Sequence, residues 1–265
     1  MRTLAGLILC DTEFWPGHKT ARLFGSGCSK LFCPACPLAQ RKDCFNVTCT
    51  LSIRQVTGWL QTANPDIDSV SLEGGEWVDM RGKREDGASL IALLDEMNPR
   101  YHVRLRTRGM EGSIWEDFHN LARVVEFLDF DLIGPEWTRI RVLPSDSALD
   151  LERMTERLRI NLSAIRNTLA AKDNPDSGAM NRFKHPNFDY RIHTTVHPYT
   201  CELVDDLDKM KADYIDAFNL SPDHWYLHKY KPHARSSQQM RDMVDAYTDA
   251  QLQEAAERLG AVYAG

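Results

Sequence analysis

The sequence lacks a long hydrophobic run. Its first apolar stretch, Leu4 to Leu9, is followed by the acidic residues Asp11 and Glu13, so it is too short to cross a bilayer. No small-residue cleavage site of an export signal follows it. We therefore expect a cytoplasmic protein with no membrane partner. Thiols stay reduced in the cytoplasm, so the seven cysteines are not expected to form disulfides.

The chain also lacks an excess of positive charge, internal repeats and low-complexity segments. Its 32 Lys and Arg residues stand against 38 Asp and Glu residues, which gives a formal net charge of -6. A protein with this balance has no basic surface for phosphates, and we expect no nucleic-acid partner. The 265 residues are 43% hydrophobic and 26% charged, which is typical of a soluble globular protein with one sizeable core.

Short apolar segments alternate with helical patterns along the chain. Strands are predicted over 20–26, 67–75, 101–107, 124–135, 137–144, 188–198 and 224–232. Helices are predicted over 51–63, 87–98, 115–122, 147–172, 199–219 and 237–260. Alternation of this kind predicts an α/β fold with a mostly parallel sheet and outer helices. Functional sites of such folds lie in the loops at the carboxyl ends of the strands.

Four of the seven cysteines lie within residues 28–44, directly after the predicted strand 20–26. Cys28, Cys33 and Cys36 have the spacing C-x4-C-x2-C. Three thiolates this close can hold three irons of a 4Fe–4S cluster and leave the fourth iron open. Structural zinc instead needs a closed set of four ligands, for which Cys44 or Cys49 could supply the fourth. The spacing alone favours neither metal.

The following strand favours the iron–sulfur cluster. It ends in Gly74, Gly75 and Glu76, and the carboxyl ends of parallel strands meet at one edge of a sheet. Two adjacent glycines let the backbone approach a ligand closely. The Glu76 carboxylate beside them can accept hydrogen bonds from an ammonium group. Together with the cysteine triplet, this motif indicates a cluster and a small cofactor at the same edge.

These motifs resemble those of radical S-adenosylmethionine (SAM) enzymes. Within that superfamily the chain is most similar to the glycyl-radical-enzyme activases, in particular the activating proteins of anaerobic ribonucleotide reductase. The resemblance covers most of the chain and rests on "FWPGHKTARLFGSGCSKLFCPACP", "SVSLEGGE", "YHVRLRTRG", "FLDFDLIGP", "YRIHTTVHP" and "WYLHKYKP".

The resemblance implies an incomplete (β/α)6 barrel over residues 1–235, with a cluster loop at 25–50 and a C-terminal helix in 236–265 packed on it. The residues that it places at the site are Cys28, Cys33 and Cys36 as cluster ligands, Gly74, Gly75 and Glu76 at the methionyl amine of SAM, and Thr107, Asp131 and His197 near the cofactor, with Tyr230 near the pocket.

The resemblance also implies an activity and two partners. A reduced 4Fe–4S cluster would cleave SAM to a 5′-deoxyadenosyl radical, which would abstract hydrogen from a glycine of a partner enzyme. That partner would be a glycyl radical enzyme, in the first place the large subunit of anaerobic ribonucleotide reductase. The electron would come from a low-potential donor such as flavodoxin or ferredoxin.

The sequence departs from the family at four points. It has one extra residue between Cys28 and Cys33, Ala35 in place of an aromatic residue, Trp77 in place of a proline and Ile133 in place of a lysine. These departures affect the expected geometry of SAM and the choice of substrate. Two alternatives therefore stand beside the activase: a radical SAM enzyme acting on a small molecule, similar to 7-deazaguanine synthases, and a non-enzymatic scaffold with zinc on Cys33, Cys36, Cys44 and Cys49.

Three histidines within the last two of these motifs, "YRIHTTVHP" and "WYLHKYKP", need an interpretation of their own. His193 and His228, on predicted strands, are each interpreted as structural or exposed. His197 precedes a proline at a predicted strand end and is the one to test as a site residue.

Overall fold

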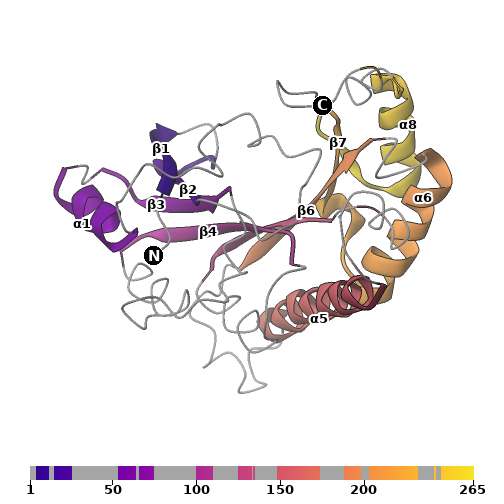
Figure 1. The fold of residues 1–265 in the computed structure, drawn as a ribbon, viewed down its shortest axis with the longest axis horizontal. Helices are drawn as coiled ribbons and strands as arrows, with labels where there is room; N and C mark the ends of the chain where they lie inside the picture. Colours follow the sequence, from indigo (N-terminus) through magenta and orange to yellow (C-terminus); the bar gives the residue numbers. More distant parts are fainter. Residues whose placement is uncertain are drawn as a thin grey trace.

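The computed structural model describes residues 4–11, 15–25, 53–63, 66–74, 100–109, 125–132, 134, 148–173, 188–197, 203–231, 242 and 246–265. These residues contain one eight-stranded sheet whose strands follow one another in chain order, from β1 to β8 (Figure 1). Within the described residues β1 and β8 form opposite edges, so the sheet is open.

The sheet is parallel apart from its first strand. β1 (Leu4–Asp11) pairs antiparallel with β2 (Thr20–Gly25). From β2 onward each strand pairs parallel with the next: β3 (Ser69–Glu73), β4 (His102–Thr107), β5 (Phe127–Asp131), β6 (Asp189–Val196), β7 (Trp225–Lys229) and the short β8 (Val262–Tyr263). This sequential parallel order confirms the predicted α/β fold, and it is the order of an incomplete TIM-like barrel.

Helices occupy several of the connections between parallel strands. They are α1 (Ile53–Ala63), α5 (Ala148–Asp173), α6 (Leu203–Met210) and α8 (Asp249–Leu259). After α6 the chain continues through a π-helical turn, Lys211–Ile215, and a 3-10 turn, Asp216–Phe218. Asn219, at φ 51°, ends this segment in the left-handed conformation. No described helix is long and apolar enough to cross a membrane.

One hydrophobic core joins the helices to one face of the sheet. Successive side chains of a strand point to opposite faces, and register aligns Leu23, Leu72, Leu105 and Leu128 on neighbouring strands. All four are at most 2% exposed and pack in one cluster with buried residues of the four helices. This face is called the apolar face. The helical residues of the cluster include Leu60, Leu158, Leu162, Leu207, Leu252 and Leu259.

The C-terminal helix differs from its prediction. The sequence predicted one helix over 237–260, but α8 begins only at Asp249, and Ala246 to Thr248 are not helical. The Thr248 hydroxyl accepts from the Gln251 N–H, and the Gln251 side chain accepts from the Thr248 N–H. This capping box fixes the helix start within a pattern that looks continuous in the sequence. β8, which follows α8, was not predicted because two residues carry no periodic signal.

β1 was not predicted either, because the apolar run from Leu4 to Leu9 shows no alternation of apolar and polar residues. The other described strands and α-helices lie, to within one residue, in the ranges that the sequence predicted. The predicted elements over 87–98, 115–122 and 137–144 lie outside the described residues.

Candidate functional site

The carboxyl edge of the sheet brings the starts of the two predicted cofactor motifs together. β2 and β3 pair parallel and in register up to Phe24 and Glu73, so the two strands end side by side. The chain leaves β2 toward the cysteines and leaves β3 toward the glycines. Cys28, Cys33, Cys36, Gly75 and Glu76 themselves lie outside the described residues.

Gly74 is the one residue of the glycine motif that the structure describes. It directly follows β3, is buried, and has a φ of 61°. A side chain is unfavourable in this left-handed region, so glycine lets the strand turn at once where it ends. The turn lies beside the end of β2. A loop that binds a ligand between the ends of these two strands needs its turn at this position.

Glu73 fixes the end of β3. Its carboxylate accepts two hydrogen bonds from the Arg22 guanidinium, both of 2.8 Å, and one of 3.0 Å from the Ser71 hydroxyl. The Glu73 side chain is only 5% exposed. A bidentate pair of this kind holds both partners in one orientation. The pair therefore ties the ends of β2 and β3 together just before the two motifs.

Thr107 ends β4 and shapes the turn that follows. Its hydroxyl oxygen accepts from the Gly109 N–H at 3.1 Å, and Gly109 has a φ of 62°. In register Thr107 lies beside Phe130 of the apolar face. The structure thus gives Thr107 a role in the backbone turn; its predicted role near the cofactor remains a prediction.

Asp131 ends β5 and binds Arg106 of β4. Three hydrogen bonds from the guanidinium, of 2.7, 2.9 and 3.2 Å, reach its two oxygens. The charge of Asp131 keeps the pKa of Arg106 above its usual range. Both side chains stay partly exposed, at 35% for Arg106 and 27% for Asp131. The predicted cofactor residue therefore comes with a cation that the sequence motif did not include.

His197 follows β6 and lies against Tyr230, which follows β7. The two rings meet edge to face with centroids 4.3 Å apart, and both residues are buried. Burial lowers the pKa of His197 to about 4, so its imidazole is neutral at pH 7. The structure thus joins the two residues that the resemblance placed near the pocket.

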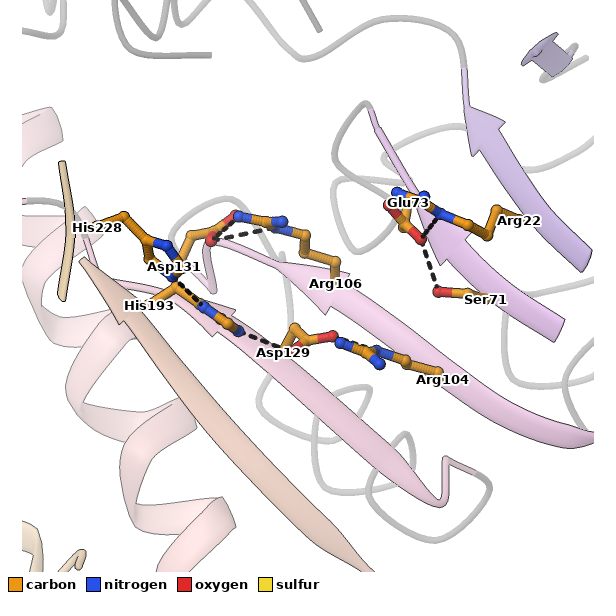
Figure 2. Close-up of polar contacts among 9 residues, drawn as sticks. All are labelled: Arg22, Ser71, Glu73, Arg104, Arg106, Asp129, Asp131, His193 and His228. Atoms are coloured by element: carbon orange, nitrogen blue, oxygen red, sulfur yellow. Dashed lines mark hydrogen bonds and ion pairs between the residues drawn. The ribbon is translucent and has the colours of Figure 1, made fainter. Parts of the chain in front are cut away.

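A chain of polar side chains that the sequence did not predict crosses the other face of the sheet, called here the polar face (Figure 2). Arg104 pairs with one oxygen of Asp129, and the other oxygen lies 2.7 Å from His193 Nε2. His193 Nδ1 in turn lies 2.8 Å from His228 Nε2. These four residues come from β4, β5, β6 and β7 in that order, and are called the polar chain.

The polar chain follows a simple geometric rule. Register places Arg104 beside Phe127, Asp129 beside Arg191 and His193 beside Tyr226. Each member instead bonds the residue two positions further along the next strand. Each successive member of the polar chain therefore lies closer to the carboxyl edge. The last member, His228, lies one residue before the end of β7.

Most side chains of the polar chain are largely buried, so its charged groups need partners of opposite charge or hydrogen bonds. Arg104 and Asp129 have side chains only 6% and 3% exposed, and His193 is 11% exposed. Burial by itself would raise the pKa of Asp129, but the hydrogen bond from His193 and the charge of Arg104 outweigh it and hold that pKa below its usual range. Asp129 is therefore a carboxylate at all ordinary pH values.

One signal in the sequence could have revealed the polar chain. Parallel strands buried on both faces are usually continuous hydrophobic runs, whereas "HVRLRT" and "FLDFD" place charged residues at alternate positions. That alternation predicts a polar face. It does not predict which cation meets which anion, because the pairs depend on register.

The described residues offer no competing metal site. They contain no group of three or more His, Cys, Asp or Glu residues that could hold a metal ion. The predicted cluster ligands Cys28, Cys33 and Cys36, like Cys44 and Cys49 of the zinc alternative, lie outside the part of the chain that was searched.

Comparisons with known proteins gave structural likenesses only. No protein-family model matches the sequence, and no curated protein matches it. Among solved structures, anSMEcpe with bound AdoMet aligns with a TM-score of 0.46 and 14% identity over 76% of this chain and 48% of that one. A domain of pyruvate-formate lyase-activating enzyme from Bacteroides vulgatus ATCC 8482 aligns with a TM-score of 0.40 and 13% identity over 74% of this chain and 98% of that one. The chain thus spans about half the length of anSMEcpe.

Proposed function

We propose that this chain is a radical SAM enzyme in which Cys28, Cys33 and Cys36 hold a 4Fe–4S cluster. Gly74, Gly75 and Glu76 would hold the methionyl amine of SAM. The observation that supports the proposal is the in-register parallel pairing of β2 and β3, which starts both motifs from neighbouring strand ends.

The residues present fit this cofactor pair. Three thiolates are the ligand set of a cluster with one open iron. Gly74 turns the backbone where β3 ends, which fits a loop that presents backbone groups to a ligand. The Glu73–Arg22 pair holds the two strand ends together, so the motifs would be anchored on a fixed base.

When bound and reduced, a cluster of this kind would supply the electron that breaks the C5′–S bond of SAM, with methionine as the leaving group, so that the 5′-deoxyadenosyl group can abstract hydrogen. The chain's own residues would bind the cluster through the three thiolates and orient SAM through the glycine motif. Glu76 would accept hydrogen bonds from the SAM ammonium group.

As the finer part of the proposal, the hydrogen would come from a backbone glycine of a glycyl radical enzyme, in the first place anaerobic ribonucleotide reductase. Flavodoxin or ferredoxin would donate the electron, and the reaction would take place in the cytoplasm. The sequence resemblance to glycyl-radical-enzyme activases supports this choice.

The test of the cluster compares cysteine variants after anaerobic reconstitution with iron and sulfide. The wild-type chain is expected to bind about four irons. Single substitutions C28S, C33S and C36S should each lower iron and sulfide content and abolish 5′-deoxyadenosine formation with dithionite and SAM. C201S serves as the matched control and should behave like wild type. Tightly bound zinc without iron, lost on C44S or C49S, would overturn the proposal in favour of the scaffold.

The test of the partner uses electron paramagnetic resonance. The loaded enzyme, mixed with reduced anaerobic ribonucleotide reductase and SAM, should produce the doublet of a glycyl radical. SAM cleavage without this doublet would contradict the activase assignment and favour a small-molecule substrate.

A further inference from the structure

The polar chain has a defined order of donors and acceptors. The Asp129 carboxylate can only accept, so His193 Nε2 must carry the proton of their 2.7 Å hydrogen bond. A neutral His193 then accepts at Nδ1, and His228 Nε2 donates across 2.8 Å. This arrangement leaves Nδ1 of His228 with an unshared electron pair. In the described part of the chain no hydrogen-bond partner faces that atom, and the His228 ring is only half-buried.

The surroundings disfavour a proton that stays on His228. Burial first, and then the positive charges of a protonated His193, Arg106 and Lys231, together lower the pKa of His228 to about 4, against an opposite effect of Asp131. A proton on His193 would instead lie beside the Asp129 carboxylate, to which it is already hydrogen-bonded. When a proton binds His228 Nδ1, transfer of the Nε2 proton of His228 to His193 is therefore favoured.

We propose that Asp129, His193 and His228 form a proton relay, in which His228 Nδ1 takes a proton from a hydroxyl, amine or thiol group of a ligand at the carboxyl edge. The O–H, N–H or S–H bond of the ligand breaks, and an N–H bond forms at His228 Nδ1. The Nε2 proton of His228 moves to Nδ1 of His193. The ligand becomes an anion, His193 becomes an imidazolium beside Asp129, and no electron is transferred.

The relay goes beyond the proposed radical chemistry and does not depend on it. Hydrogen abstraction from carbon needs no base, so neither a cluster nor SAM enters the relay. His228 would contact the ligand, whereas His193 and Asp129 act as positioning residues. Arg104 balances the charge of Asp129 and so keeps it ionised within the sheet.

The first experiment follows the protons by nitrogen NMR of the full chain labelled with ¹⁵N-histidine, with the resonances assigned through H193Q and H228Q. Near pH 8 both rings are expected to be protonated at Nε2 only. On acidification one proton uptake should change both rings together: His193 becomes doubly protonated, and His228 switches to the Nδ1–H form. Uptake of the first proton by His228 as an imidazolium, or independent titration of the two rings, would overturn the relay.

The second experiment measures the reactivity of His228 Nδ1 with diethyl pyrocarbonate, followed by peptide mass spectrometry. Nδ1 attacks a carbonyl carbon of the probe, and ethyl carbonate leaves, takes a proton from water and breaks down to ethanol and carbon dioxide. The Nε2 proton passes to His193. D129N should slow this modification at least about tenfold, because the acceptor loses its carboxylate. H193Q breaks the relay at a less buried position and should give the same result if D129N does not fold.

Outcomes of the two proposals are distinguishable. A rate at His228 in D129N and H193Q within about twofold of wild type would overturn the relay, whether or not the protein binds iron. If C28S loses iron binding but His193 and His228 still change protonation together, the relay is supported independently of the cluster.

Discussion

The two faces of the sheet come from the same strands but are held together by different interactions. The apolar face carries rows such as Leu23, Leu72 and Leu105, which are fully buried against the helices. The polar face carries Arg104 and Asp129, which are also buried but are joined to each other and to His193 by charge and hydrogen bonds. Burial alone therefore does not distinguish the two faces; chemistry does.

The comparison predicts a different cost of substitution on each face. Hydrophobic burial stabilises in proportion to area, whereas a buried ion pair loses hydration that its mutual attraction only partly restores. An apolar pair could replace Arg104 and Asp129 at little cost to stability. We therefore expect the two faces to respond differently to substitution, and four predictions test this difference.

The largest effect is expected on the apolar face. Phe130 is fully buried, so F130A should lower the free energy of unfolding by about 4 kcal/mol through lost burial and the cavity left behind. Urea denaturation followed by circular dichroism measures the change. W59A is the control, because Trp59 is 44% exposed and its loss should cost less than about 0.5 kcal/mol. Equal effects of the two variants would contradict this expectation.

The next effect comes from breaking the polar chain on one side. R104M leaves the buried carboxylate of Asp129 without its cation and should cost about 3 kcal/mol. The double variant R104M/D129L removes both charges and should recover most of that stability while abolishing the coupled titration of His193. Recovery of neither stability nor folding would mean that the pair stabilises the fold directly.

A smaller loss of stability is expected at Gly109, in the turn that follows β4 next to Phe130 of the apolar face. A Cβ added at Gly109 would lie 2.3 Å from the ring of Phe130, and Gly109 has a φ of 62°. G109A should therefore cost about 2 kcal/mol through strain and displacement of the ring. G58A is the matched control: Gly58 lies in α1 with nothing within 4 Å, so alanine should stabilise by about 0.5–1 kcal/mol. Thermal unfolding measures both, and a neutral G109A would contradict the packing described here.

The last effect, the smallest when taken for one histidine over one pH unit, is a dependence of stability on pH at the carboxyl edge. The pKa values of His197 and His228 are lowered to about 4 in the folded chain, below the ordinary value of 6.5. The unfolded chain therefore binds more protons between these values, and stability should fall as pH decreases from 6.5 toward 4. The slope is at most about 1.4 kcal/mol per pH unit for each histidine.

Urea denaturation between pH 7 and pH 4 measures this slope. H197F keeps a ring against Tyr230 but removes the titrating group, so its slope should be shallower than that of wild type. An unchanged slope would show that His197 does not contribute.

Most of the fold could be predicted because periodicity and strand ends are local signals. "HVRLRT" alternates and "SVSLEGG" ends in glycines, and both strands lie where these patterns indicated. The start of α8 could not be predicted from hydrophobic spacing alone, because a capping box at Thr248 overrides a pattern that continues on both sides. The site was predicted only as far as its motifs: the cofactor roles of Thr107, Asp131 and His197 stay predictions, and the pairing of Asp131 with Arg106 was not predicted.

The sequence by itself determined the alternation of strands and helices, the alternation of charge within the strands, and the order of the cysteine and glycine motifs. Only the tertiary structure decided that β2 and β3 end side by side and that Asp129 joins His193 to His228. The physical reason is register. Residues 64 and 35 positions apart meet because each side chain bonds the residue two positions beyond its register partner on the next strand, and no local pattern records which residues are register partners.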